Sequence, residues 1–174
     1  MRSGPQLSMS QAQVLIKTIS KANIDDALRD IDESKSSGLD RFSSHFFVAN
    51  WDIIKEDVYT AILHFFNDGA MYSPINITSI TLVLKITNAS KPKHFRPTPC
   101  CFVLYKIIAK ILMVRLQTVV AHLVDPAQSG FIPGRQSCEN ILLATDLIRG
   151  YNWANASPRC MLKVDMAKAY DSVE

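Results

Sequence analysis

One long amphipathic segment, residues 102–123, limits the folds open to this chain more than any other feature of its sequence. Apolar residues recur in it at spacings of three and four, which predicts an α-helix with one buried face. Lys106, Lys110 and Arg115 interrupt the run, so the segment is not a membrane span. At about 3.6 residues per turn, Arg115 falls inside the apolar stripe. Its guanidinium must therefore reach an anion or, as we favour, pair with a carboxylate or a backbone carbonyl.

The segments around this helix predict an α+β fold. Residues 75–86 are rich in β-branched side chains and residues 160–165 form an apolar run, so each is predicted to be a strand. Residues 88–99 hold three prolines and are predicted to be a loop. Helical periodicity recurs in three further segments, 10–33 (one or two helices), 51–66 and 137–149.

Charge is distributed unevenly along the chain. Residues 1–68 carry seven Lys/Arg and ten Asp/Glu, whereas residues 69–124 carry seven Lys/Arg and no acid at all. Residues 125–174 carry five Lys/Arg and six Asp/Glu. The acid-free stretch indicates a surface that faces a polyanion such as nucleic acid. A solvated helix face beside a basic loop would give the same counts.

The four cysteines form no C-x-x-C pair, so the sequence predicts neither a zinc site nor a disulfide framework. The first residues lack the apolar stretch of a secretory signal. Both observations predict an intracellular protein of the nucleus or cytoplasm that is not secreted. We expect no membrane association and no obligate protein partner.

Residues that could carry chemistry lie at the ends of the predicted strands. Asp165 ends an apolar strand, a position at which phosphoryl-transfer enzymes hold a divalent metal ion. Lys85 ends the earlier strand, and Arg96 stands before a proline. Such a lysine and arginine could grip a triphosphate while the carboxylate holds its Mg²⁺. Singly, each signal is weak, since a lysine at a strand end is usually solvated.

Seven short motifs follow one another in an order that resembles a known family. The order and spacing resemble the reverse transcriptase of LINE-type (non-LTR) retrotransposons, most closely those of plants, over roughly residues 20–174. The motifs are 35–40 (KSSGLD), 82–85 (LVLK), 95–97 (FRP), 104–112 (LYKIIAKIL), 128–135 (QSGFIPGR), 140–144 (NILLA) and 163–173 (KVDMAKAYDSV).

The resemblance implies a right-hand polymerase fold, of which this chain would hold the fingers and the first part of the palm. Residues 21–70 would form the N-terminal helices and a loop, 71–135 the fingers and 136–174 the start of the palm. Residues 1–20 match poorly.

The resemblance also implies roles for individual residues. Asp165 would be the first catalytic aspartate and bind both metal ions, Mg²⁺ or Mn²⁺. Lys85 and Arg96 would contact the incoming deoxynucleotide triphosphate, and Tyr170 would exclude a ribose 2′-OH. The phosphates would also touch the backbone of Met166, Ala167, Lys168 and Ala169. The RNA template and DNA primer would lie near Gln128, Gly130, Phe131 and Arg135, with Lys106 and Lys110 also facing nucleic acid.

Several positions depart from the family pattern. Arg41 replaces the glycine that ends the family's Gly-x-Asp-Gly turn, which disfavours a turn with positive φ. Leu84 replaces a proline, and residues 98–99 (TP) replace Ile-Ser. No Tyr-x-Asp-Asp motif or thumb follows Glu174 in this sequence, so we expect the chain alone to be inactive. The alternatives are a non-catalytic nucleic-acid-binding remnant of a retrotransposon and a polypeptide with no function.

Overall fold

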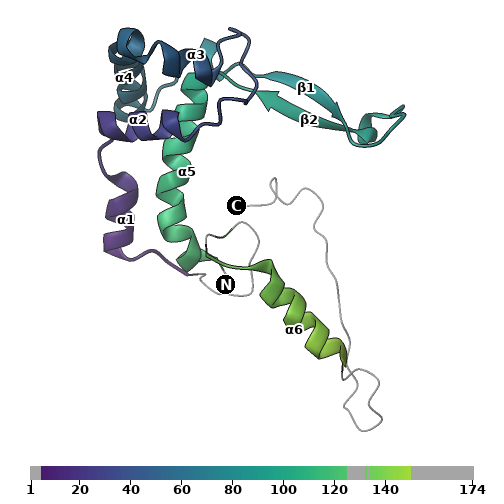
Figure 1. The fold of residues 1–174 in the computed structure, drawn as a ribbon. Coiled ribbons are helices and arrows are strands. Elements are labelled where there is room, and N and C mark those ends of the chain that lie inside the picture. Colours follow the sequence, from purple (N-terminus) through teal and green to yellow (C-terminus); the bar gives the residue numbers. More distant parts are fainter. Residues whose placement is uncertain (1–4, 125–131, 133, 150–174) are drawn as a thin grey trace. The chain divides into compact units, whose positions relative to one another are not determined.

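The computed structural model describes residues 5–124, residue 132 and residues 134–149 (Figure 1). The chain divides into two compact units, 1–125 and 126–174. In the second unit the described helix is α6 (Ser137–Arg149), which confirms the helix predicted there. Within the described residues, no helix is both long enough and apolar enough to cross a membrane.

The first unit contains every other helix that the sequence predicts and one that it does not. Residues 10–33 form two helices because Ser8 and Ser20 each cap one, accepting a hydrogen bond at 3.3 Å from the backbone N–H three residues on. The unpredicted helix, α3, is too short to show a helical period. The helices are α1 (Met9–Ile16), α2 (Lys21–Arg29), α3 (Ser44–Ala49), α4 (Trp51–Asp68) and α5 (Val103–Leu123).

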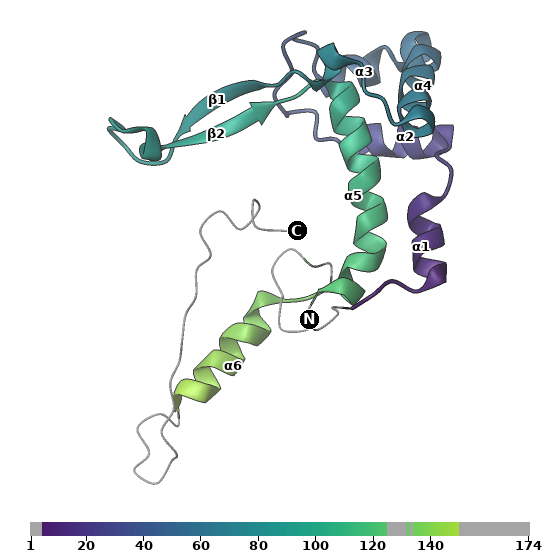
Figure 2. The same ribbon diagram turned by 180° about the vertical axis from the view of Figure 1, so that it is seen from behind.

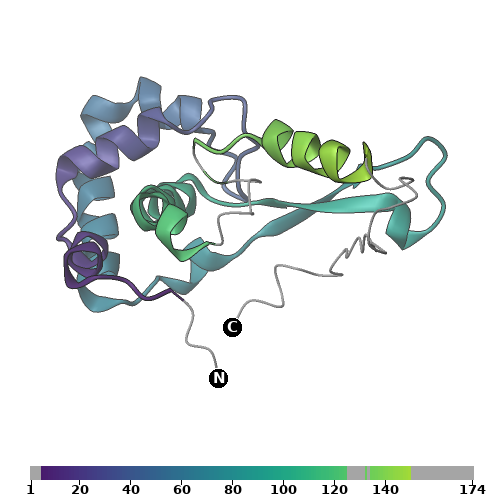
Figure 3. The same ribbon diagram turned by 90° about the horizontal axis from the view of Figure 1, so that it is seen from below.

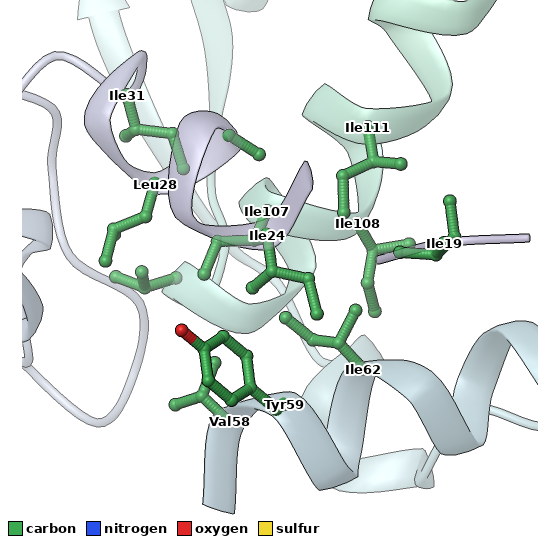
Figure 4. Close-up of a cluster of buried hydrophobic side chains, with 12 residues drawn as sticks. Ile19, Ile24, Leu28, Ile31, Val58, Tyr59, Ile62, Ile107, Ile108 and Ile111 are labelled. Carbon is green, nitrogen blue, oxygen red and sulfur yellow. The ribbon is translucent and has the colours of Figure 1, made fainter. Parts of the chain in front are cut away.

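The core lies where α2 and α4 pack against α5. Ile24 of α2, Ile62 of α4 and Ile107 of α5 are fully buried, and Figure 4 shows them in one cluster of apolar side chains. Each such isoleucine contributes about 1.5–3 kcal/mol of transfer free energy. The far half of the helix is covered unevenly, since Val119 is 2% exposed whereas Leu112 and Leu116 are 43% and 55% exposed.

Arg115 is paired with backbone carbonyls, as the sequence favoured. Its guanidinium donates to the carbonyl oxygen of Leu15 at 2.9 Å and to that of Lys17. These carbonyls belong to the end of α1, a helix with no basic residue in its last turn. Arg115 of α5 therefore supplies the cation that this helix end favours.

A tight turn forms in the loop between α2 and α3 although Arg41 stands where the family pattern has a glycine. The N–H of Arg41 donates to the carbonyl oxygen of Gly38 at 3.1 Å, and Arg41 has a φ of 62°, in the left-handed region. Gly38 packs closely on the start of α5, because an added Cβ would lie 2.8 Å from the backbone nitrogen of Phe102. The turn thus forms with an arginine in a conformation that favours glycine.

A two-stranded antiparallel hairpin projects from the helices (Figures 1 and 2). Its strands are β1 (Ser79–Leu84) and β2 (Phe95–Cys100), and Figure 3 shows them extending away from α5. β1 confirms the strand predicted within residues 75–86. It begins later than predicted because Ser73–Asn76 form a short 3₁₀ turn that contains a proline.

β2 contradicts the prediction of a loop for residues 88–99. Just beyond the last strand pair, Leu84–Phe95, the Lys85 N–H donates to the carbonyl oxygen of His94 at 2.8 Å, which marks this as a hydrogen-bonding position of the ladder. Such positions alternate with non-hydrogen-bonded ones along antiparallel strands. Pro97 and Pro99 therefore both fall at non-hydrogen-bonded pairs, where a missing N–H removes no bond of the ladder.

Candidate functional site

Lys85 and Arg96 come from the two sides of the hairpin and share one of its faces. Arg96 lies opposite Val83, and Lys85 follows two residues after Val83, opposite His94. Residues two apart on a strand point to the same side of the sheet. Diagonal neighbours across two strands lie about 7–8 Å apart. The hairpin therefore brings one lysine and one arginine within reach of a single ligand.

The alternation of residues gives the hairpin two chemically different faces. The face opposite Lys85 is apolar, and its Ile80, Leu82 and Leu84 are 65%, 62% and 62% exposed. Lys85 and Arg96 are exposed as well, and neither side chain forms a hydrogen bond or an ion pair with any described residue. Their positive charges are therefore available to an anion from outside the described part of the chain.

Lys106 and Lys110 both contact the loop that follows α2. Lys106 Nζ donates to the carbonyl oxygen of Ser36 at 2.5 Å. Lys110 Nζ lies 3.3 Å from Oδ2 of Asp30, and the Lys110 side chain is 23% exposed. These contacts attach the loop to α5. A contact of either lysine with nucleic acid stays a prediction.

The same two lysines border a groove of about 540 Å³ between that loop, the end of β2 and α5. Apolar side chains, among them Tyr105 and Met113, make up much of its lining, Lys35 adds a third ammonium group, and Asp30 and Asp32 add two carboxylates. An apolar lining in which cations outnumber carboxylates suits a base and its phosphate. The groove could not be found from the sequence because its walls come from three separate segments.

Cys100, at the end of β2, has a perturbed thiol. Hydrogen bonds with Ser36 and with Thr81, whose Oγ1 lies 3.4 Å from the sulfur, hold the pKa of Cys100 below its usual value, and the charge of Lys106 adds to the effect. Sequence reasoning considered the cysteines only as zinc ligands or disulfide partners and missed this environment.

The remaining residues assigned by the resemblance are not brought together by the described structure. Arg135 lies in the second unit, where its N–H donates to the carbonyl oxygen of Ile132 at 3.2 Å. Among the residues the structure describes, no three His, Cys, Asp or Glu side chains gather closely enough to hold a metal ion. Nine predicted site residues lie outside the described residues, namely Gln128, Gly130, Phe131, Asp165, Met166, Ala167, Lys168, Ala169 and Tyr170.

Comparison with known proteins identifies relatives that are much longer than this chain. It is 29% identical over 170 residues, 98% of its length, to the "Transposon TX1 uncharacterized 149 kDa protein" of Xenopus laevis. It is 27% identical over 105 residues, 60% of its length, to the "Retrovirus-related Pol polyprotein from type-2 retrotransposable element R2DM" of Drosophila melanogaster. The matched regions are only 13% and 10% of these two proteins.

A family model matches the chain from the loop between β1 and β2 to residue 174. Residues 86–174, about half of the 174 residues, match the family described as "Reverse transcriptase (RNA-dependent DNA polymerase)". The matched range includes Arg96, both lysines of α5 and the segment around Asp165. The chain therefore belongs to the reverse transcriptase family of RNA-dependent DNA polymerases.

Proposed function

We propose that this chain supplies the fingers and the start of the palm of an RNA-directed DNA polymerase from a LINE-type, non-LTR retrotransposon, most similar to those of plants. A reverse transcriptase domain implies the right-hand polymerase fold, and the helices and small sheet of the described residues are consistent with one part of it. The relatives are named as proteins of a transposon and of a retrotransposable element, which supports this kind of source.

The observation that carries the proposal is the pair formed by Lys85 and Arg96 on one exposed face. A deoxynucleotide triphosphate presents several anionic oxygens along a short chain. A guanidinium can bind two of them at once, while an ammonium acts as a compact point charge. Two such groups on neighbouring register positions can therefore grip one triphosphate, which positions the reacting phosphoryl group.

The metal ion of the reaction is assigned to Asp165. A carboxylate is a hard oxygen donor of the kind that Mg²⁺ and Mn²⁺ prefer. When bound, the ions would neutralise charge that develops on the transferred phosphoryl group. The backbone of residues 166–169 would hold the phosphates, and Tyr170 would exclude a 2′-OH.

The RNA template and DNA primer are assigned to the remaining predicted residues. The groove beside Lys106 and Lys110 supports this, because its lining is largely apolar and its three lysines outnumber its two aspartates. Gln128, Gly130, Phe131 and Arg135 would contact the template from the following segment. Mutating a lysine that contacts a phosphate should reduce the slope of log binding constant against log salt concentration by about one.

The test measures by calorimetry the binding of dTTP, in the presence of Mg²⁺, to the full chain. We expect Lys85→Ala and Arg96→Ala each to weaken binding about tenfold or more, since a charge-assisted hydrogen bond contributes roughly 1.5–3 kcal/mol. Lys93→Ala is the matched control, because it removes the same charge from the exposed loop of the same hairpin. It should change the affinity less than about threefold.

Two results would contradict the proposal. If Lys93→Ala weakens binding as much as Lys85→Ala, the hairpin attracts anions without a specific site. If the chain binds no dTTP yet binds an RNA–DNA duplex with a salt dependence that Lys106→Glu and Lys110→Glu reduce, it is instead a non-catalytic nucleic-acid-binding remnant.

A further inference from the structure

Most of the hydrogen bonds in the loop that joins the two strands of the hairpin involve one residue, His94. The strands end at Leu84 and begin again at Phe95, so the connection is much longer than the two to five residues usual for hairpins. Long connections leave the last pair of a ladder poorly constrained, because closing a longer loop costs more entropy. In this hairpin the last strand pair is Leu84–Phe95, and Lys85 follows directly after it, hydrogen-bonded to His94.

His94 makes four hydrogen bonds that close the loop. Its carbonyl oxygen accepts from the Lys85 N–H, and its own N–H donates to the carbonyl oxygen of Lys91, both at 2.8 Å. Its ring Nδ1 accepts from the N–H groups of Ser90 and Lys91 at 3.2 and 3.3 Å. Within residues 85–94, every side-chain hydrogen bond ends on this one nitrogen.

These contacts assign the chemical form of the ring. A backbone N–H can only donate, so Nδ1 must carry a lone pair, and the proton of the neutral ring is on Nε2. The ring is half-buried, whereas the neighbouring loop residues are mostly exposed. The ring therefore acts as a hydrogen-bond acceptor for two backbone N–H groups. An alanine at this position has no acceptor to replace it.

We propose that His94 is a positioning residue for the nucleotide-binding pair. Its ring closes the loop, the closed loop keeps the Lys85–His94 pair of the ladder formed, and that pair keeps Lys85 on the same face as Arg96. The proposal rests on the proposed function in one respect only, the assignment of a triphosphate to Lys85 and Arg96. The closing of the loop by His94 stands on the hydrogen bonds alone.

The test uses three variants of the full chain and one control. His94→Asn is the conservative variant, because the asparagine oxygen occupies the place of Nδ1 and accepts the same bonds. His94→Gln puts its oxygen one bond further out, near the place of Nε2, and His94→Ala has no acceptor. Thr87→Ala is the control, since Thr87 is exposed in the same loop and its side chain makes no hydrogen bond there.

Two measurements are made on each protein: amide hydrogen exchange of Lys85, Ser90 and Lys91 by NMR, and the affinity for dTTP with Mg²⁺. His94→Ala and His94→Gln should speed exchange at these amides about tenfold or more. They should weaken dTTP binding by a similar factor while the midpoint of global unfolding stays unchanged. His94→Asn should restore both quantities to within about threefold of the unaltered chain, and Thr87→Ala should change neither.

The two measurements separate the failure of this inference from the failure of the proposed function. Unchanged exchange in His94→Ala, or no recovery in His94→Asn, overturns the role of His94. Faster exchange with undiminished dTTP affinity also overturns it, because the loop would then not position the pair. If the unaltered chain binds no dTTP, the proposed function fails, and the exchange measurement alone decides whether His94 closes the loop.

Discussion

Replacing Arg41 by glycine should stabilise the first unit by about 0.5–1 kcal/mol. Arg41 has a φ of 62°, and in this left-handed region a residue with a Cβ is strained by roughly 1–2 kcal/mol, whereas glycine is not. Glycine loses about 0.5–1 kcal/mol more backbone entropy on folding. The strain that is relieved exceeds this entropy cost, so the Arg41→Gly variant should be the more stable protein. The arginine side chain is exposed and makes no hydrogen bond or ion pair with the described residues, so its removal costs little.

Arg41→Ala is the control that separates the backbone from the side chain. Alanine removes the guanidinium but keeps the Cβ, so this variant should be no more stable than the unaltered chain. The assay is urea unfolding of the full chain followed by circular dichroism. With a slope of roughly 1.5 kcal/mol per molar urea, the midpoint of Arg41→Gly should rise by about 0.3–0.7 M.

A particular outcome would refute the reasoning about the turn. If Arg41→Ala gains as much stability as Arg41→Gly, the effect comes from the side chain and not from the left-handed conformation. If Arg41→Gly is less stable than Arg41→Ala, the turn does not hold residue 41 at positive φ in solution.

Two further predictions concern groups at the ends and in the core of the helices. Arg115→Met should loosen α1 by about 1–3 kcal/mol, because it removes a charged donor from the carbonyls of Leu15 and Lys17; faster amide exchange in α1 would show this, and unchanged exchange would refute it. A 2.6 Å hydrogen bond to Asp25 raises the pKa of Tyr59 to about 12, so the stability that this bond gives should be complete below pH 10 and lost as the pH rises toward 12. Asp25→Asn should return the titration of this phenol, followed by its ultraviolet absorbance, toward the ordinary pKa of a tyrosine, and an unchanged titration would contradict the assignment.

All described helices except the short α3 could be predicted, because their signals are local. The apolar period of α5 is long, and the serines that begin α1 and α2 lie three residues before a glutamine or an asparagine that completes a capping box. The pairing of Arg115 could also be foreseen, because a guanidinium inside an apolar stripe must find an acceptor. Its partners lie about a hundred residues earlier, so no local pattern could name them.

The sequence does not reveal β2, because a count of prolines hides their spacing. Pro97 and Pro99 are two residues apart, so both point their missing N–H to the same side of the strand. The two-residue spacing is visible in the sequence. Whether the prolines fall at hydrogen-bonded or non-hydrogen-bonded positions depends on which residue of β1 lies opposite each of them. The shared face of Lys85 and Arg96 depends on the same register. The resemblance named both residues, and only the hairpin shows why they can act together.

The same spacing limits how the sheet can grow. An outer edge attracts a further strand through its free N–H groups. On β2 the outward positions are Phe95, Pro97 and Pro99; the two prolines have no donor, and the N–H of Phe95 already donates to the carbonyl oxygen of Pro92. That edge therefore offers an approaching strand acceptors but no donors. Any third strand, from this chain or from another molecule, should add beside β1, so aggregation by strand addition is open on one side of the hairpin only.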